Sequence, residues 1–445
     1  MSRRRKRKPL PSDPVSATIE SLSHDGRGVT HIDGKATFID GALPGEEIRF
    51  KYTRVSRKYD EGSVIDIVHS STHRVEPHCR HFSICGGCSL QHMDPSAQIA
   101  SKQDVLLSNL KHIGNVSPES VLSPLTGPYW GYRNKARLGA RYVQKKNRLL
   151  VGFREKRNSF IADLCRCEVL DERIGGRLEE LAGVISSLGN FKYIPQIEVA
   201  ATQSQMALVF RCLQPFTEQD KDRLTEFGKQ FDFQIYQQPG GPESITLIWP
   251  EEATLSYRLD AYDVELFFKP GDFTQVNSMI NESMVRQAIE LLSLQSDDTV
   301  LDLFCGIGNF TLPMARVAGS VTGIEGSEDL LRRASDNARR NNLENVDFVN
   351  ENLYRDDIGM AGFLNNSYNK VLLDPPRSGA REVIEELHHV GAGSIVYVSC
   401  NTATLARDAG KLVNDHGYKL VSAGVMDMFP HTAHVESMVL FKKTS

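Results

Sequence analysis

Several features are missing from this 445-residue sequence, and each absence excludes a class of protein. No stretch approaches the ~18 consecutive apolar residues that a membrane-spanning helix requires. The N-terminus has no apolar core like that of a secretory signal peptide. We therefore expect a cytoplasmic protein, and a monomer, that makes no contact with a membrane.

A complete dinucleotide-binding fingerprint is also absent. Residues 299–310 read as a buried strand followed by a turn, but Gly306 and Gly308 are not joined by a third glycine at the required offset. Paired glycines let a backbone approach a ligand closely, although many strand–turn–helix units carry them for packing alone. This turn therefore indicates nucleoside binding only together with other features.

What is present is typical of a soluble, globular chain. Hydrophobic residues make up 40% and charged residues 24% of the sequence, and the length suits about three domains of ~100–200 residues. The net charge is −4, yet residues 3–8 are consecutive arginines and lysines. We predict that residues 1–11 form a disordered basic tail, which is either simply solvated or contacts RNA phosphates.

Residues 12–70 are rich in short alternating segments. We expect strands at 15–19, 35–39, 47–55 and 64–68, separated by turns that contain glycine. Such a set predicts a small barrel of the oligonucleotide-binding kind. The third strand and the loop after it carry the basic residues Arg49, Lys51, Arg54, Arg57 and Lys58. These charges favour RNA binding over a purely structural cap, and the segment resembles a TRAM domain, an RNA-binding module.

Eight cysteines in a cytoplasmic chain argue for metal binding or catalysis rather than disulfides. Cys79, Cys85 and Cys88 have the spacing C-x5-C-x2-C, which converges easily on one metal. Either Cys165 or Cys167 could supply a fourth thiolate. Zinc and an iron–sulfur cluster both accept four thiolates, so the spacing leaves the two open.

The pattern of elements predicts two further domains. Residues 71–95 and 130–268 form an α+β central domain, with a helix at 175–188; residues 96–129 and 269–445 form a doubly wound α/β domain. The expected strands of the latter are 299–304, 320–324, 346–349, 370–373, 394–399 and 438–441, and its helices include 96–115, 281–292 and 328–341. Between these domains, residues 128–137 interleave aromatic and basic residues, a mixture that slightly favours RNA contact over an amphipathic strand.

Chemically active side chains follow the strands of the last domain. Glu325 ends the second strand, as do the acids that accept hydrogen bonds from ribose hydroxyls. Asp374 follows the fourth strand and Cys400 the fifth. Because the carboxyl ends of parallel strands meet at one crevice, we expect Asp374 and Cys400 to flank a substrate there, with Cys400 as a covalent nucleophile.

Four motifs in this domain carry a resemblance to a known family. They are Asp-Leu-Phe-Cys-Gly-Ile-Gly-Asn-Phe at 302–310, Leu-Asp-Pro-Pro-Arg-Ser-Gly at 373–379, Val-Ser-Cys-Asn at 398–401 and Phe-Pro-His-Thr-Ala-His-Val-Glu at 429–436. Together they resemble the RNA uracil-C5 methyltransferases that use S-adenosylmethionine. The TRAM-like barrel and the cysteines narrow the resemblance to the bacterial enzymes that act on 23S rRNA.

The resemblance implies a reaction and a set of site residues. Cys400 would add to C6 of a uracil, C5 would take the methyl group, and Glu436 would remove the C5 proton. The implied cofactor contacts are Gln275, Phe304, Asn309, Glu325, Asn352 and Asp374. The family also carries a [4Fe-4S] cluster, which the resemblance assigns to Cys79, Cys85, Cys88 and Cys167; Glu168, where the family often has proline, weakens the last match.

Other functions fit less well. An exocyclic-amine methyltransferase usually has an aromatic residue after Asp-Pro-Pro, and a cytosine-C5 enzyme has cysteine after the proline, but Arg377 stands there. A tRNA uracil methyltransferase is disfavoured by the barrel and the cluster cysteines. A non-catalytic RNA-binding assembly factor is disfavoured because both Cys400 and Glu436 are present.

Overall fold

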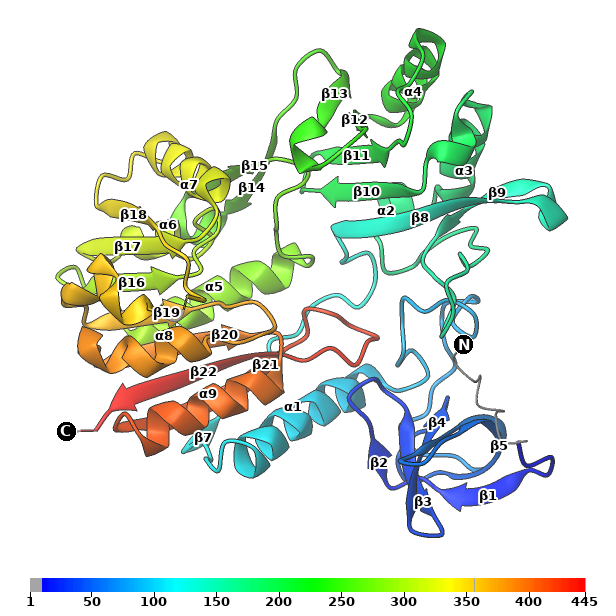
Figure 1. The fold of residues 1–445 in the computed structure, drawn as a ribbon, viewed down its shortest axis with the longest axis horizontal. Helices are drawn as coiled ribbons and strands as arrows, with labels where there is room; N and C mark the ends of the chain where they lie inside the picture. The colour runs from blue at the N-terminus through cyan, green and yellow to red at the C-terminus, as the bar shows by residue number, and fades with distance from the viewer. Residues whose placement is uncertain (1–9, 356, 445) are drawn as a thin grey trace, which may run out of the picture. The chain divides into compact units, whose positions relative to one another are not determined.

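The computed structural model describes residues 10–355 and 357–444 (Figure 1). The predicted basic run at 3–8 lies outside them. Two compact units make up the chain: residues up to Lys102 together with Phe429–His434, and residues from Gln103 to Met428 together with those after Val435. Of the helices that the described residues form, none is long and apolar enough to span a bilayer.

The first unit is built on a six-stranded sheet in the order β1-β5-β6-β4-β3-β2. Its strands are β1 (Val15–Thr18), β2 (Ser21–Leu22), β3 (Gly28–Ile32), β4 (Lys35–Asp40), β5 (Glu47–Val55) and β6 (Asp60–His69). Alternate residues face one core, in which Ile19, Ile39, Ile48 and Phe50 are buried. The four predicted strands are present, and the short β2 and β3 lie among the turn residues that we did not assign to strands.

A long loop follows β6 in the first unit and leads to α1 (Pro95–His112), which begins there and extends past Lys102. Arg74 of this loop donates through Nε to Oε1 of the fully buried Glu46, at 2.5 Å. The segment Phe429–His434 is held in the same unit, since the amides of Ser89 and Leu90 both donate to the carbonyl of His431 at 2.9 Å. Gln98 accepts from the amide of His431 at 2.8 Å.

The second unit contains an α+β part, as predicted, around the sheet β13-β12-β11-β10-β8-β9. Its strands are β8 (Lys135–Val143), β9 (Arg148–Gly152), β10 (Gln196–Ala201), β11 (Met206–Arg211), β12 (Gln234–Gln238) and β13 (Thr246–Trp249). The helix expected at 175–188 is two helices, α2 (Glu172–Gly175) and α3 (Leu178–Ser187), so that prediction was wrong at its start. A third helix, α4 (Glu218–Phe231), packs on β12 and β13.

A hairpin connects this part to the rest of the second unit. Its strands, β14 (Leu255–Leu259) and β15 (Val264–Phe268), pair with each other. Two asparagines bind this hairpin to α7 (Glu328–Arg340): Asn337, in the helix, and Asn341, its C-cap. Their side chains form hydrogen bonds with the backbone of β15. The amide of Phe267, for example, donates to Asn337 Oδ1 at 2.9 Å. These hydrogen bonds hold β15 against α7, so the loop that follows β15 starts at a strand whose position is fixed.

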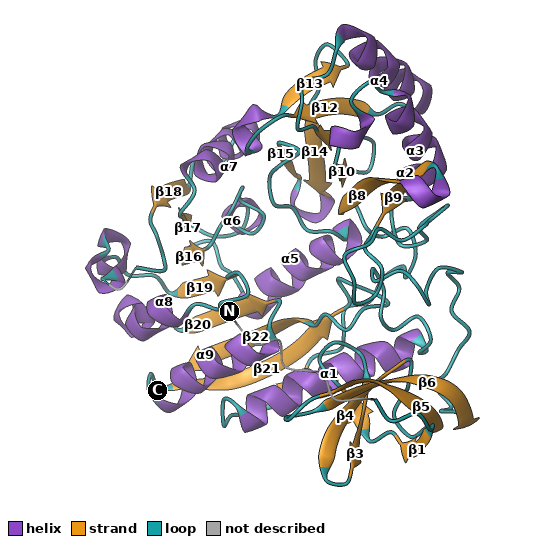
Figure 2. Ribbon diagram, turned by 45° about the vertical axis from the view of Figure 1, so that its right-hand side comes forward, coloured by secondary structure: helices purple, strands orange, loops and turns teal. Residues whose placement is uncertain are grey.

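The predicted doubly wound sheet is confirmed. Eight strands run in the order β18-β17-β16-β19-β20-β22-β21-β7 (Figure 2). They are β16 (Thr299–Leu303), β17 (Ser320–Glu325), β18 (Val346–Asn350), β19 (Lys370–Leu373), β20 (Ser394–Ser399), β21 (Tyr418–Met426), β22 (Glu436–Lys443) and β7 (Ser120–Val121). The sequence reading missed β21 and β7. The helices that accompany the sheet are α5 (Ser278–Leu292), α6 (Thr311–Ala315), α7, α8 (Arg381–Glu386) and α9 (Thr402–Asn414).

The central strands of this sheet are buried on both faces, which is why they read as apolar runs rather than as alternating patterns. β16 to β20 run parallel, and β22 runs antiparallel between β20 and β21. The carboxyl ends of β16 to β20 therefore lie at one edge of the sheet, and the amino end of β22 lies at the same edge. Of the predicted site residues, Glu325 ends β17, Asp374 and Cys400 follow β19 and β20, and Glu436 begins β22.

Candidate active site

The turn between β16 and α6 has the backbone geometry of a close ligand approach. Phe304, Gly306 and Gly308 all have positive φ, at 68°, 56° and 95°. A side chain at Gly308 would lie 3.0 Å from Leu312. Phe304 pays a conformational cost in this region, as residues at functional sites often do. Its ring centroid lies 5.6 Å from that of Tyr354.

Glu325, at the end of β17, is fixed to this turn. Its Oε2 accepts from the amide of Gly306 at 3.2 Å, and its Oε1 accepts from the amide of Ser327, the N-cap of α7, at 2.8 Å. The carboxylate is therefore held between the glycine turn and the start of a helix. This placement agrees with the role of an acid that receives ribose hydroxyls.

Asn309 and Asn352 lie near the turn but use their side chains within the protein. Asn309 exchanges two hydrogen bonds with Asn281, at 2.9 and 3.0 Å, and its Oδ1 also accepts from the hydroxyl of Tyr257. Asn352 Oδ1 accepts from the amide of Tyr354 at 3.0 Å. In this state both side chains position neighbouring segments, and any contact with a cofactor remains a prediction for them.

Gln275 lies in the loop between β15 and α5, beside the exposed Phe273. That loop is held by Asp272, which is 7% exposed and forms an ion pair of 2.6 Å with Arg333 of α7. Lys135, the first residue of β8, donates to the Asp272 carbonyl, and burial lowers the pKa of this lysine to about 8. The sequence reading missed this network because its members lie nearly 200 residues apart.

The network changes the interpretation of the basic residues at 128–137. Lys135 is engaged with the loop, and Arg133 lies over the ring of Phe153, 5.6 Å from its centroid. Arg137, whose side chain is 72% exposed, pairs with Glu198 at 2.8 Å. Much of this stretch therefore serves the protein's own packing, and Arg137 is its most outward cation of the three.

Two aspartates with raised pKa, Asp302 and Asp374, lie near the strand ends, and Asp302 is buried. Asp302, in β16, is 1% exposed and accepts from the hydroxyl of Thr311 at 2.5 Å. Burial, together with the nearby carboxylates of Asp374 and Glu325, raises the pKa of Asp302 to about 7. Burial alone raises the pKa of Asp374 to about 7. Asp302 was missed, although an acid inside the apolar run Val-Leu-Asp-Leu was a usable signal.

The sheet register brings Cys400 and Glu436 together. Ser399, the last residue of β20, pairs with Ser437 in antiparallel β22. The next position along β20 is Cys400 and the preceding position along β22 is Glu436, so the two residues face each other at the sheet edge. The hydroxyl of Ser437 donates to the Ser399 carbonyl at 3.2 Å and supports this pairing.

The thiol of Cys400 is neutral in this environment. Burial, followed by the negative charges of Glu436 and Asp374, raises its pKa to about 11, while the Arg377 guanidinium acts in the opposite direction. Cys400 is thus surrounded by the three charged residues that sequence motifs had placed near it: Asp374, Arg377 and Glu436. Burial also raises the pKa of Cys305, which stays a packing residue.

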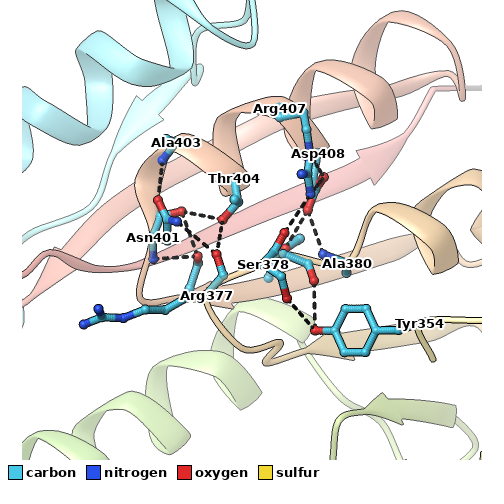
Figure 3. Close-up of polar contacts among 12 residues, drawn as sticks. Tyr354, Arg377, Ser378, Ala380, Asn401, Ala403, Thr404, Arg407 and Asp408 are labelled. Carbon is cyan, nitrogen blue, oxygen red and sulfur yellow. Dashed lines mark hydrogen bonds and ion pairs between the residues drawn. The ribbon is translucent and has the colours of Figure 1, made fainter. Parts of the chain in front are cut away.

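A hydrogen-bonded frame fixes the segment that carries Arg377 (Figure 3). Asn401 donates to the Arg377 carbonyl at 2.9 Å, and its Oδ1 caps α9 by accepting from the amide of Ala403 at 3.1 Å. Asp408 of α9 accepts from the amide of Ala380 at 2.9 Å and from the hydroxyl of Tyr397 at 2.8 Å. The segments that follow β19 and β20 are therefore joined through the start of one helix.

The predicted cluster cysteines lie in both compact units. Cys79, Cys85 and Cys88 belong to the loop between β6 and α1 in the first unit, where the amide of Gly87 donates to Cys85 Sγ at 3.4 Å. Cys165 and Cys167 belong to the second unit. Within residues 10–355 and 357–444, no group of three or more His, Cys, Asp or Glu side chains is arranged to hold a metal ion.

Comparison with known proteins matches this site to one family. The family model described as tRNA (Uracil-5-)-methyltransferase matches residues 196–444, and the TRAM domain model matches residues 15–65. The chain belongs to the uracil-C5 RNA methyltransferases. The predicted TRAM domain is confirmed as well.

Relatives of this methyltransferase extend over its whole length. It is 52% identical to a protein of Alcanivorax borkumensis named 23S rRNA (uracil(1939)-C(5))-methyltransferase RlmD, over 99% of both chains. It is 50% identical to a protein of the same name from Methylococcus capsulatus, over 100% of both chains. A solved structure of the Pyrococcus abyssi tRNA (uracil-54, C5)-methyltransferase with S-adenosyl-L-homocysteine aligns with a TM-score of 0.72 at 26% identity, covering 96% of this chain and 100% of that one.

Proposed function

We propose that this uracil-C5 methyltransferase uses S-adenosylmethionine to methylate C5 of one uridine in 23S rRNA, the uridine numbered 1939 in the names of its relatives. The observation that carries the proposal is that Cys400 and Glu436 adjoin the Ser399–Ser437 pair of β20 and β22, and that the charges of Glu436 and Asp374 both act on the Cys400 thiol. A nucleophile and a base that face each other at a strand end suit a substrate ring inserted between them. The choice of 23S rRNA as the substrate comes from the names of the relatives.

Covalent addition answers the chemical difficulty of this reaction, because C5 of uracil is a poor nucleophile. The Cys400 thiol gives its proton to water, and the thiolate sulfur forms a bond to C6 as the electron pair of the C5–C6 double bond moves toward C5 and the O4 carbonyl. C5 then takes the methyl group, and the electron pair of the broken carbon–sulfur bond stays on the donor. S-adenosylmethionine supplies an electrophilic methyl group for this step.

Release of the product needs a base on the opposite strand. Glu436 accepts the C5 proton, the C5–C6 double bond forms again, and the bond between C6 and the Cys400 sulfur breaks. The register that aligns Glu436 with Cys400 suits this pair of steps. A carboxylate here also raises the pKa of the thiol, so the two charges are best kept apart in time.

Arg377 assists the first step, the addition of the Cys400 sulfur to C6, by stabilising the thiolate. Its guanidinium opposes the effect of burial and of the two acids on the Cys400 thiol. A permanent cation beside a thiolate stabilises it. Asp374, whose pKa is raised to about 7, accepts or donates a hydrogen bond according to its protonation, and either form can contact the polar edge of uracil.

The decisive experiment is methyl transfer with labelled donor to 23S rRNA that lacks its natural modifications, with the product mapped at nucleotide resolution. We expect one labelled uridine and a modified C5. If tRNA were labelled instead, the protein would be a tRNA methyltransferase, as the Pyrococcus abyssi enzyme is named. No transfer to either RNA, with the donor still bound, would favour a non-catalytic assembly factor.

We also propose a [4Fe-4S] cluster on Cys79, Cys85, Cys88 and Cys167. The support is chemical: four thiolates suit a cluster, and the first three are closely spaced. No step of methyl transfer uses it, so its role would be structural. Iron and sulfide analysis of anaerobically purified protein tests this. If the protein contained zinc and no iron, the site would be a zinc site and not a cluster. If iron were lost in Cys165→Ser but kept in Cys167→Ser, the fourth ligand would be Cys165.

The N-terminal regions are proposed to bind RNA that flanks the target. The positive charge at residues 3–8 and on β5 supports this, because phosphate contacts provide salt-dependent affinity. Removing residues 1–70 should weaken RNA binding and leave donor affinity intact; unchanged RNA affinity would refute it. We further propose that the enzyme is cytoplasmic and acts as a monomer. Light scattering of the purified chain tests the oligomeric state.

A further inference from the structure

Three carboxyl groups lie at the ends of adjacent parallel strands in the second unit. Asp302 is in β16, where it pairs with Gly323 of β17 and Leu372 of β19. Glu325 ends β17, and Asp374 follows β19, with its amide donating to the Leu303 carbonyl at 3.3 Å. These positions line the place where the family's donor is expected.

The three groups differ in how the protein satisfies them. Glu325 accepts from two backbone amides. Asp302 accepts from the Thr311 hydroxyl through Oδ2, but its Oδ1 is buried without a hydrogen-bonding partner. Among the residues that the structure describes, no cationic side chain forms an ion pair with Asp302 or Asp374. A buried carboxylate without a cation is costly, and Asp302, which is 1% exposed, has no cationic partner among the described residues.

The surroundings of Asp302 contain acids and a thiol, whereas the Cys400 thiol beside Asp374 is also approached by the Arg377 guanidinium and the Glu436 carboxylate. Asp302 faces the carboxylates of Asp374 and Glu325, the hydroxyl of Thr311 and the thiol of Cys305. Asp374 faces Asp302 and the thiol of Cys400. Burial raises the pKa of both aspartates to about 7. One proton on the pair is therefore about half bound at pH 7.

The methyl donor and its product differ by one charge. S-adenosylmethionine carries a sulfonium, an ammonium and a carboxylate, for a net charge of +1, whereas S-adenosylhomocysteine has a neutral thioether and a net charge of zero. Bringing a cation close to a carboxyl group favours the ionised form. Among the described residues neither Asp302 nor Asp374 is ion-paired, so the site should respond differently to the two molecules.

We propose that Asp302 and Asp374 act together as a charge sensor for the cofactor: binding of the sulfonium donor releases a proton from the pair, and formation of the neutral product allows the pair to take one up. Asp302 is thereby a specificity-determining residue that favours the charged donor over the spent one. The inference rests on the proposed use of S-adenosylmethionine and deepens it.

The expected pH dependence follows from proton linkage. A group that is protonated in the free site and ionised in the complex makes the donor bind more tightly as the pH rises through its free pKa. For one proton and a pKa of about 7, donor affinity rises about tenfold between pH 6 and pH 8. Affinity for the neutral product stays within about twofold over the same range, because its binding leaves the pair protonated.

The test is calorimetry with the full chain at pH 7, in two buffers whose ionisation enthalpies differ, so that released protons are counted directly. With S-adenosylmethionine we expect release of about 0.5 proton per site, and with S-adenosylhomocysteine close to none. The release should persist in Cys400→Ala, which removes the thiol beside Asp374, and fall in Asp302→Asn. Asp297→Asn, an exposed acid at the other end of β16, is the matched control.

Each outcome has a meaning. Donor binding without proton release, or equal release with donor and product, overturns the charge sensor and leaves the proposed function standing. Failure of the donor to bind at all refutes the proposed function as well. If Asp302→Asn does not fold, the proton counts of the unchanged protein still decide the matter, because they require no variant.

Discussion

Two groups of residues at the same end of the large sheet are held in place in different ways. We call them the donor side, at the ends of β16 and β17, and the chemical side, around Cys400, Arg377 and Glu436. On the donor side, at the ends of β16 and β17, Glu325 is fixed by the amides of Gly306 and Ser327, which belong to the two adjoining strand–helix connections. On the chemical side, Cys400, Arg377 and Glu436 come from three connections and are aligned by strand register and by the start of α9. The donor side therefore depends mainly on local backbone geometry, whereas the chemical side depends on tertiary hydrogen bonds.

This difference predicts which changes are tolerated. Local turns reform whenever their strand and helix form, so a conservative change on the donor side should weaken binding gradually. The chemical side has no such reserve, because its reacting groups meet only if distant segments keep their register. The substitutions below separate the two sides, beginning with the largest expected effect.

Replacing Cys400 by alanine should abolish methyl transfer, with a loss of at least about 10⁴-fold, since the nucleophile has no substitute. Donor affinity should stay within about threefold, because Cys400 is not among the donor contacts. Transfer is measured with labelled donor and binding by calorimetry. Cys212→Ala, a change of a fully buried cysteine outside the site, is the control. Surviving transfer in Cys400→Ala would refute the covalent mechanism.

Replacing Glu436 by glutamine should lower the turnover rate by about 10²–10⁴-fold, the usual contribution of a general base. The amide keeps the size of the side chain but cannot take the C5 proton. RNA should therefore accumulate as a covalent adduct on Cys400 after the methyl group is transferred. A denaturing gel with labelled RNA detects this adduct. Normal turnover without an adduct would assign proton removal to another group.

Replacing Asp272 by alanine should destabilise the protein by about 3 kcal/mol, because it leaves the mostly buried Arg333 without its partner. The loop with Phe273 and Gln275 would also loosen, so donor affinity should fall while the turnover rate at saturation changes less. Thermal unfolding and calorimetry measure the two effects. Arg332→Ala, whose ion pairs are exposed, is the control and should cost less than about 1 kcal/mol.

Replacing Asn401 tests the frame on the chemical side with the smallest expected change. Asn401→Ala removes the cap of α9 and should cost about 1 kcal/mol of stability. Asn401→Asp keeps the cap but cannot donate to the Arg377 carbonyl. If Asn401 positions Arg377, alkylation of Cys400 will shift to higher pH in both variants, as mass spectrometry can show. A shift in neither would leave Asn401 a helix cap alone.

Parts of this molecule were predictable because their signals are local. The glycine turn, the acid that ends β17 and the alternation of strands and helices are each written within about 30 residues. The strand β21, Tyr418–Met426, was missed although Asp415 and Gly417 form a turn signal before it, because Ser-Ala-Gly at 422–424 has low strand propensity. The short β7 was missed because two residues carry no periodic pattern at all.

The functional residues divide along the same line. Cys400, Asp374 and Glu436 could be named from motifs because their chemistry is rare at strand ends. Asp302 and Asp272 could not be assigned roles, because an acid in an apolar strand or loop shows its purpose only through the partners around it. Those partners, such as Thr311 for Asp302 and Arg333 for Asp272, are fixed by packing.

The sequence by itself determined the class of fold and proposed the donor turn and the reacting groups, since each depends on residues that are close together in the chain. Only the tertiary structure decided that Cys400 stands opposite Glu436, because a strand register is set by pairing between segments and not by either segment alone. It also decided that Asp302, which is 1% exposed, lies near the carboxylates of Asp374 and Glu325. Burial and register are properties of the folded chain, and they convert a list of reactive residues into a site.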